Sequence, residues 1–281
     1  MTLPDFLIIG AMKCGTSTLA AQLGAQPGIF MTTPKEPNFF SDDAVFAQGM
    51  GWYESLFADA APGDLKGEAS THYTKLPTYP DCVDRLSAAL DAPTLIYMIR
   101  NPVARTVSHF IHEWTMGGMS GGVAEAFARH PELVAYSRYA MQIAPYVEAF
   151  GAGRILMVSL EHLQTDPQAE LARVGAFLGL ERTPLWQEEQ ARMNVSAERV
   201  RRFPLYGLLV DNPVAAGLRR ALVPQGLRDA VKARLQMRKR PELPADLTRD
   251  LEAIFAEDYA ALRGLFPDAD HLAASYPFVT P

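Results

Sequence analysis

The residues best suited to chemistry lie near the N-terminus, in the segment GAMKCGTSTL over residues 10–19. A glycine-bearing turn between a buried strand and a helix points backbone N–H groups and the positive end of the helix at one place, which suits a phosphate. Lys13 adds a full positive charge, and hydroxyl groups follow at Thr16, Ser17 and Thr18. The segment therefore predicts a phosphate-binding turn. The alternative is an ordinary strand–helix turn with a surface lysine.

The spacing of this turn separates it from the loops of nucleoside triphosphatases. Those loops place a lysine directly after the second glycine, where it reaches the terminal phosphates. Here Thr16 follows Gly15, and the lysine comes two residues before that glycine. The turn therefore lacks the lysine that such enzymes require, and a nucleotide kinase is retained as an alternative function.

A second segment with anion-binding residues is RNPVARTVS, over residues 100–108. Arg100 follows a buried apolar run, and a helix is expected to start with Asn101 as its N-cap and Pro102 at its first position. Arg100 can hold a phosphate with two parallel hydrogen bonds, and Ser108 adds a hydroxyl two helical turns later. In a parallel sheet both segments meet at the edge where ligands bind. The alternative is a capped helix with a surface arginine.

Two separate anion sites indicate the kind of nucleotide that would bind. They suit a nucleotide with phosphate groups on both sides of a ribose. Kinases, by contrast, hold their phosphates in one linear chain and require Mg²⁺. We therefore expect a doubly phosphorylated nucleotide and no metal.

The patterns K-x-G-T-S-x-L over residues 13–19 and R-x-P-x-x-R-x-x-S over residues 100–108 resemble those of sulfotransferases that use 3′-phosphoadenosine-5′-phosphosulfate (PAPS). The resemblance continues through SLEHL at residues 159–163 and FLGL at residues 177–180, and covers most of residues 5–180. It points to a bacterial member of the family, closest to its heparan-sulfate-type (glycan) branch. It implies PAPS as the donor and 3′-phosphoadenosine-5′-phosphate (PAP) as the product.

The resemblance also assigns roles within the two segments. The turn would cradle the 5′-phosphosulfate, with Lys13 stabilising the leaving oxygen. The second segment would hold the 3′-phosphate through Arg100 and Ser108. The cofactor contacts expected in the turn are Lys13, Cys14, Gly15, Thr16, Ser17 and Thr18.

A catalytic base is expected in KEPNFF, over residues 35–40. This segment resembles the K-E-x-x-F-F of the heparan-sulfate-type branch, whose glutamate serves as the base, and so implies that role for Glu36. Because Pro37 follows, we expect Glu36 to be extended, and the two phenylalanines to exclude water and raise its pKa. The alternative is a loop carboxylate that is merely paired with Lys35.

Further candidates follow in GEASTHY, over residues 67–73, which occupies the place of the family's E-K-[ST]-x-x-Y segment. Ala69 replaces the lysine that contacts sulfate and acceptor in the glycan enzymes, which puts heparan-like substrates in doubt. His72 is the reserve base, because the small-molecule branch of the family uses histidine. The candidates given less weight are Glu68, His109 and His112, the last of which is expected on a helix surface.

Charge is divided unevenly along the chain. The 281 residues include 26 Lys+Arg and 32 Asp+Glu, a formal net charge of −6. Residues 192–240 hold twelve basic and three acidic residues, a local charge of +9, so the remainder carries −15. The acidic average argues against a surface-wide polyanion binder, and no nucleic-acid partner is expected. Within RKRP, Arg238 and Lys239 are expected to contact the 3′-phosphate or the adenine edge; the alternative is a solvated helix face.

The elements that must position these residues alternate along the chain, which predicts an α/β, P-loop-like three-layer fold with a central parallel sheet and a helical C-terminal third. We expect one sulfotransferase domain over residues 1–281. Its strands are expected at residues 6–9, 94–99 and 154–160, helices at residues 18–23 and 171–178, a variable helical segment at about 192–240 and a closing helix at about 247–265.

Other features narrow the class of protein. Cys14 and Cys82 are the only cysteines, which makes a disulfide framework or a zinc site unexpected. No apolar run approaches the ~18 residues of a membrane span and no leader is evident, so a soluble cytoplasmic protein is expected. The prediction is sulfuryl transfer from PAPS to a hydroxyl or amine of a small-molecule or glycan acceptor. The alternatives are the kinase and a non-catalytic nucleotide-binding module.

Overall fold

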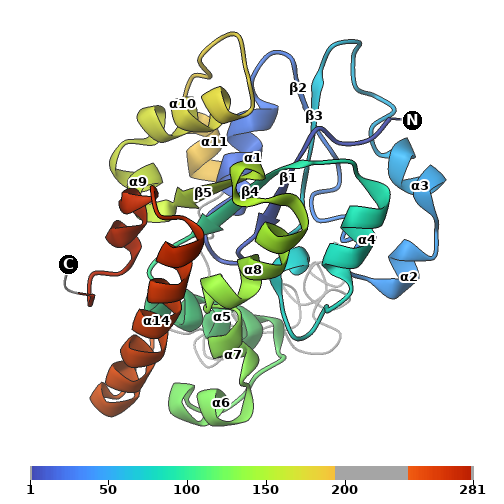
Figure 1. Cartoon of the computed structure of the whole chain (residues 1–281). Coiled ribbons are helices and arrows are strands. Elements are labelled where there is room, and N and C mark those ends of the chain that lie inside the picture. The colour runs from blue at the N-terminus through green and yellow to red at the C-terminus, as the bar shows by residue number, and fades with distance from the viewer. Residues whose placement is uncertain (1, 194–239, 280–281) are drawn as a thin grey trace, which may run out of the picture.

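The computed structural model describes residues 2–193 and 240–279, and its architecture is shown in Figure 1. Within these residues five strands form one sheet in which every pairing is parallel, in the order β2-β3-β1-β4-β5. The strands are β1 (Phe6–Gly10), β2 (Ile29–Met31), β3 (Leu65–Ala69), β4 (Thr94–Ile99) and β5 (Ile155–Ser159).

Helices cover both sides of the sheet, so the predicted α/β class with its three layers is confirmed. In Figure 1, α1, α10 and α11 gather on one side, while α4, α8 and α14 lie on the other. The helices are α1 (Thr16–Gly24), α2 (Asp43–Phe46), α3 (Met50–Ser55), α4 (Cys82–Ala89), α5 (Pro102–Met116), α6 (Val123–Arg129), α7 (Glu132–Ala135), α8 (Tyr139–Phe150), α9 (Leu160–Thr165), α10 (Pro167–Phe177), α11 (Glu188–Met193) and α14 (Ala245–Leu265), with 3₁₀ turns η1 (Thr71–Thr74), η2 (Ala152–Arg154) and η4 (Asp270–Ser275).

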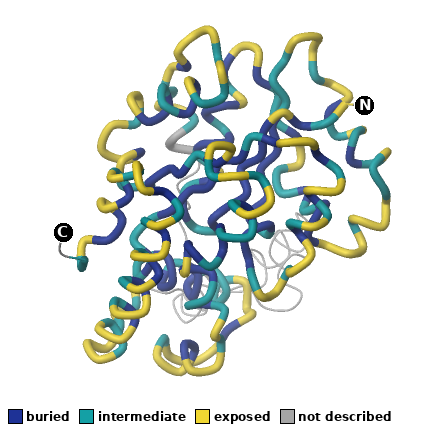
Figure 2. The backbone as a smooth tube through the Cα atoms, viewed as in Figure 1, coloured by how far each residue is buried: buried dark blue, intermediate teal, exposed yellow. Residues whose placement is uncertain are grey.

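The core lies along the central strands, which appear as the buried centre of the molecule in Figure 2. All five residues of β1 are buried, as are five of the six residues of β4. Strands buried on both faces need apolar side chains at every position, and this is why their sequences are continuous apolar runs. Among the residues described, no helix has both the length and the apolar character that crossing a bilayer would require.

The sequence predicted three of the five strands. The strand at 94–99 has the predicted bounds, whereas the one expected at 154–160 ends at Ser159, which caps α9. Strands β2 and β3 were not predicted, because β2 has only three residues and β3 has the partly polar sequence LKGEA. The closing helix is present as α14, whereas residues 194–239 of the predicted basic helical segment lie outside the described residues.

Candidate active site

The turn after β1 has the conformation of an anion cradle. Gly15 is the N-cap of α1, with φ of 89°, and as a glycine it has no side chain that could accept hydrogen bonds from the first turn of the helix. A Cβ at this position would lie 2.8 Å from Cδ1 of Leu160, so both the conformation and the space require glycine. No side chain caps the N–H groups at the start of α1, and uncapped N–H groups of this kind can bind an anion.

The side chains of the turn point in different directions. Ser17 is exposed and Thr18 is half-buried, whereas Thr16 is buried. Cys14 is fully buried, with its Sγ 3.5 Å from the hydroxyl of Tyr139, and burial raises the pKa of the thiol to about 11. Cys14 thus packs in the core, and its backbone N–H donates to Ala11 within the turn.

Lys13 and Arg100 are joined by a hydrogen bond across neighbouring strand ends. Nη1 of Arg100 donates to the carbonyl oxygen of Lys13 at 3.1 Å. Nε of Arg100 is buried and has no hydrogen-bond partner among the described residues. Burial, followed by the charges of Arg100 and Arg105, lowers the pKa of Lys13. Positive charge is therefore concentrated at this edge of the sheet, beside a buried donor without a partner. A bound oxyanion would neutralise the charge and accept a hydrogen bond from the donor.

Arg105 supports the turn after β1 through a hydrogen bond, a role that the sequence did not predict. Its side chain is fully buried, and Nη1 donates to the carbonyl oxygen of Met12 at 3.3 Å. The remaining nitrogens contact Ser137, the carbonyl oxygen of Leu133 and the imidazole of His109. Arg105, the second arginine of R-x-P-x-x-R, therefore holds the turn after β1 in place from within the core.

Helix α5 begins as the sequence predicted and carries Ser108. The side chain of Asn101 accepts from the N–H of Ala104 at 2.9 Å, and Pro102 occupies the first turn. Ser108 is half-buried, and Nη2 of Arg240 donates to the carbonyl oxygen of Ala104, one helical turn earlier, at 3.1 Å. The end of the RKRP segment thus contacts α5 beside Ser108. The predicted contacts Arg238 and Lys239 lie outside the described residues.

Glu36 follows β2 and lies against the end of β3. Its N–H donates to the carbonyl oxygen of Ala69, Lys35 forms an ion pair with its Oε1 at 2.7 Å, and the hydroxyl of Thr71 lies 3.2 Å from both carboxylate oxygens. The expected extended conformation is wrong, because φ of Glu36 is 58°, in the left-handed region.

The expected rise in the pKa of Glu36 is also wrong. Burial raises the pKa, but the charge and hydrogen bond of Lys35, followed by the charge of Lys75, outweigh burial, and the net pKa is lowered. Phe39 and Phe40 are fully buried and pack against Tyr53, with ring centroids 4.6 and 5.0 Å away. The carboxylate is therefore ionised at neutral pH and available to accept a proton.

Glu68 belongs to the core and not to the cleft. The residue is completely buried, and its carboxylate accepts from Ser70 at 2.6 Å, from the hydroxyl of Tyr73 at 2.8 Å and from the hydroxyl of Tyr53. Burial raises the pKa of this carboxyl, and the hydrogen bonds oppose the rise only in part. Its role is to join β3 to the aromatic cluster beneath Glu36.

His72 lies near Glu36 and is neutral at physiological pH. Its ring stacks on Tyr79 with centroids 4.7 Å apart, and its buried Nδ1 has no hydrogen-bond partner in the described ranges. Burial, then the charge of Lys75, lowers the pKa of His72 to about 4. His72 thus keeps its place as the reserve base.

His112 marks the centre of a charged cluster that the sequence did not predict. Burial and the charge of Lys13 lower the pKa of this half-buried imidazole, and Glu113, Lys75 and Glu36 act on it as well. The charges of four side chains, Glu113 on α5 itself and Lys13, Lys75 and Glu36 from other segments, thus act on His112, where the sequence predicted only a helix-surface histidine. His109, the other histidine of α5, is buried beside Arg105, and its Nε2 lies 3.6 Å from Oε1 of Glu113. Burial lowers the pKa of His109 to about 4, so the imidazole is neutral at pH 7.

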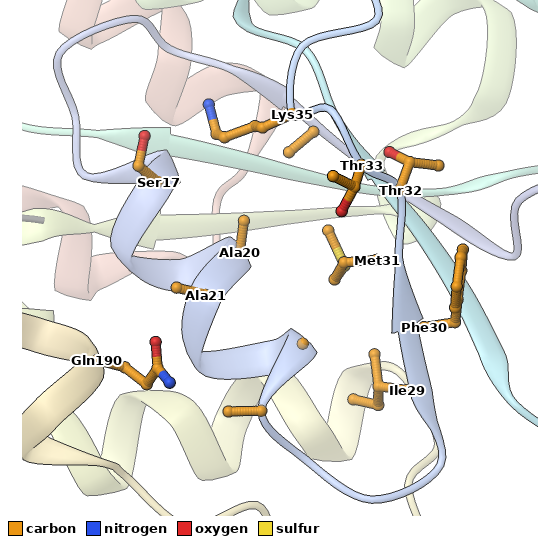
Figure 3. A pocket seen from close by; sticks show the side chains of 13 residues that line it. Ser17, Ala20, Ala21, Ile29, Phe30, Met31, Thr32, Thr33, Lys35 and Gln190 are labelled. Atoms are coloured by element: carbon orange, nitrogen blue, oxygen red, sulfur yellow. The ribbon is translucent and has the colours of Figure 1, made fainter. Parts of the chain in front are cut away.

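A cavity of about 560 Å³ lies between α1 and β2, with Lys35, the ion-pair partner of Glu36, in its lining. Figure 3 shows Ser17 and Lys35 pointing toward each other at one end of the cavity, with small side chains of α1 on one wall and β2 on the other. Among the residues described, no group of three or more His, Cys, Asp or Glu side chains is arranged to hold a metal ion.

Comparisons with known proteins agree with this geometry. The family model described as "Sulfotransferase domain" matches residues 3–206, and the chain belongs to this family. Mouse heparan sulfate glucosamine 3-O-sulfotransferase 3B1 is 31% identical over 195 residues, which covers 64% of this chain and 47% of the relative. The human heparan sulfate glucosamine 3-O-sulfotransferase 6 is 32% identical over 188 residues, covering 64% and 53%. The chain therefore spans about half the length of these curated relatives.

Solved structures with the same fold are also sulfotransferases. The sulfotransferase from Alicyclobacillus acidocaldarius has a TM-score of 0.66 at 24% identity, with 94% of this chain and 96% of that chain covered. Mouse sulfotransferase SULT7A1, solved in complex with PAP, has a TM-score of 0.52 at 17% identity, with 98% and 89% covered. The predicted P-loop-like fold is thus confirmed.

Proposed function

We propose that this protein transfers a sulfuryl group from PAPS to a hydroxyl or amine of a small-molecule or glycan acceptor. The observation that carries the proposal is the joining of two anion-binding positions through the hydrogen bond from Arg100 to the carbonyl oxygen of Lys13. An ionised carboxylate, that of Glu36, acts on the same imidazole of α5 as the ammonium of Lys13. Donor phosphates and an acceptor base thus share one site.

The residues present fit the donor. The 5′-phosphosulfate would be held by the N–H groups at the start of α1 and by the hydroxyls of Ser17 and Thr18. The 3′-phosphate would accept a hydrogen bond from the unpartnered Nε of Arg100, with Ser108 beside it. Arg240, which contacts α5 one turn before Ser108, would lie at this end of the site. The contacts predicted for Arg238 and Lys239 stay a prediction from the sequence. When bound, PAPS supplies the sulfuryl group and leaves as PAP.

Three side chains would carry the transfer. Lys13 donates a hydrogen bond to the oxygen that leaves, which gains negative charge as its bond to sulfur breaks. Glu36 accepts the proton of the acceptor as the new sulfur–oxygen or sulfur–nitrogen bond forms. His72, neutral and next to Glu36, is the alternative base.

The acceptor would enter on the Glu36 side of the site. The cavity between α1 and β2 has Ser17 of the cradle and Lys35, the partner of Glu36, at one end, which makes it suited to seat part of the acceptor. The names of the curated relatives indicate heparan sulfate as their acceptor. Ala69, in place of the glycan enzymes' lysine, favours a different acceptor here.

The test is transfer of ³⁵S from labelled PAPS to components of a producer-cell extract, with the labelled product identified by mass. The proposal requires a labelled product and an equal amount of PAP. Magnesium-dependent turnover of ATP without use of PAPS would favour the kinase instead. Tight PAP binding with no transfer to any component would favour the non-catalytic binding module.

A further inference from the structure

Lys75 is a largely buried lysine with no described carboxylate at ion-pair distance, although Glu36 and Glu113 act on it from farther away. Of the four lysines that the structure describes, Lys35 and Lys66 form ion pairs at 2.7 and 2.8 Å. Within the described ranges, Lys13 and Lys75 have no carboxylate at ion-pair distance. Lys75 is the more buried of these two, with only 8% of its surface exposed. A largely buried ammonium with no carboxylate in direct contact is costly, and an anionic ligand would lower that cost.

The backbone around Lys75 is held rigidly by buried groups. The amide side chain of Gln142, itself fully buried, accepts from the N–H of Leu76 at 2.7 Å and donates to the carbonyl oxygen of Leu76 at 2.9 Å. The hydroxyl of Tyr146 donates to the carbonyl oxygen of Tyr73 at 2.6 Å. These bonds hold the backbone on both sides of Lys75, so its side chain starts from a defined position before a ligand binds, which favours stabilisation of developing charge.

The ammonium of Lys75 lies in the cluster around His112. Its Nζ is 5.9 Å from the centre of the Tyr136 ring, and the charges of Glu36 and Glu113 act on it. Lys13 and Lys75 both act on His112, Lys13 from the side of the cradle. The titratable and charged groups that face Lys75 are Glu36, His72, Arg105, His109, His112, Glu113 and Tyr136.

We propose that Lys75 binds the oxygens of the sulfuryl group during its transfer, as a second cation on the side facing Glu36. This inference rests on the proposed function. The bond from sulfur to the phosphate oxygen of PAP breaks, the bond from sulfur to the acceptor forms, and the acceptor proton passes to Glu36. Lys75 keeps its proton throughout and donates hydrogen bonds to the sulfuryl oxygens. Lys13 therefore stabilises the leaving phosphate oxygen, and Lys75 stabilises the oxygens of the sulfuryl group while it is transferred.

The first test uses inorganic sulfate, which with PAP reproduces the two parts of the donor. Sulfate binding to the PAP-saturated protein is measured by calorimetry at pH 7 for the wild type, K75M, K75R and the control K66M, whose lysine pairs with Asp5. We expect K75M to lose at least tenfold in sulfate affinity with PAP affinity unchanged, while K75R and K66M bind sulfate within about threefold of the wild type. Equal sulfate affinity in K75M, or no sulfate binding by the wild-type PAP complex, would overturn the role of Lys75.

Failure of the wild type to bind PAP at all would instead refute the proposed function on which this inference rests. The two failures are therefore distinguishable. Circular dichroism and PAP affinity together show whether K75M is folded.

The second test follows the proton of Lys75 directly. Burial lowers the pKa of Lys75 to about 8. With only six lysines in the chain, ¹³Cε labelling of lysine gives few NMR signals, and the signal missing in K75M identifies Lys75. We expect its midpoint to rise by at least half a pH unit when PAP and sulfate are both present, because a bound anion favours the ammonium. A midpoint unchanged by sulfate would contradict the proposal.

Discussion

Nη1 of Arg100, at the end of β4, donates a 3.1 Å hydrogen bond to the backbone carbonyl oxygen of Lys13, after β1. The two strands are neighbours in the sheet and run parallel, so their carboxyl ends lie side by side. One arginine thereby couples the cradle expected to hold the 5′-phosphosulfate to the site expected to hold the 3′-phosphate. Because Nε of Arg100 has no partner among the described residues, it remains free for the expected 3′-phosphate, whose contribution can be measured by mutation.

Replacement of Arg100 by Gln should weaken binding of PAP much more than binding of adenosine 5′-phosphate, which lacks the 3′-phosphate. Loss of a charge-assisted contact to phosphate costs about 1.5–3 kcal/mol, a factor of roughly 10 to 150 in affinity. Calorimetry with both nucleotides measures the difference. Equal losses for the two nucleotides would mean that Arg100 supports the turn through Lys13 without contacting the 3′-phosphate.

Replacement of Lys13 by Met should reduce the transfer rate by about 10²- to 10³-fold, as expected for removal of one donor to a developing negative charge. Binding of PAP should fall less than the rate does, because the N–H groups of α1 remain. Single-turnover kinetics with saturating PAPS measure the rate, and K66M is the matched control. A K13M rate within twofold of the wild type would remove Lys13 from the mechanism.

The sequence predicted the parts of the fold that depend on local pattern. Strands β1 and β4 are continuous apolar runs, and Asn101 with Pro102 is an unambiguous helix start. Strand β3 was not predicted because its sequence, LKGEA, is partly polar, and residues far away in the sequence provide the contacts that allow it to be buried. Gly67 packs against Phe6 and Met31, and the carboxylate of Glu68 is satisfied by Ser70 and two tyrosines.

The sequence predicted the parts of the candidate site whose residues all lie in one continuous segment. The cradle after β1 is such a segment, and it has the predicted strand–turn–helix form. The cluster around His112 is different, because Lys75 and Glu36 join it from other segments than α5, and Lys75 lies in no recognisable motif. The pKa of Glu36 was predicted wrongly for the same reason, since Lys75 and His72 approach it only in the folded chain.

Replacement of Glu68 by Gln should change the pH dependence of stability. The folded state raises the pKa of Glu68, so its contribution is fully present below the usual pKa and is lost as pH rises through the folded value. The E68Q protein should therefore lose less stability than the wild type as pH rises from 5 to 8. Urea unfolding at several pH values measures this, and parallel curves for the two proteins would contradict the raised pKa.

Replacement of Lys75 by Met should make the protein more stable while impairing transfer. The folded pKa of about 8, against the usual 10.5, means that keeping the proton at pH 7 costs up to about 3 kcal/mol. Between these two pH values the unfolded chain binds more protons than the folded chain, so wild-type stability should rise with pH. Thermal unfolding of wild type and K75M at pH 7 and pH 10 tests this. A less stable K75M would show that Lys75 is a structural residue.

The central claim, sulfuryl transfer from PAPS with Glu36 as the base, is tested most directly by single-turnover transfer of ³⁵S from PAPS to the acceptor identified in the extract screen. Glu36→Gln is compared with Glu257→Gln, a matched change at an exposed position on α14. General-base catalysis contributes about 10²- to 10⁴-fold, so E36Q should be slowed by at least 100-fold with PAP affinity unchanged, while E257Q matches the wild type. Transfer by E36Q at the wild-type rate would contradict the claim and assign the base to His72.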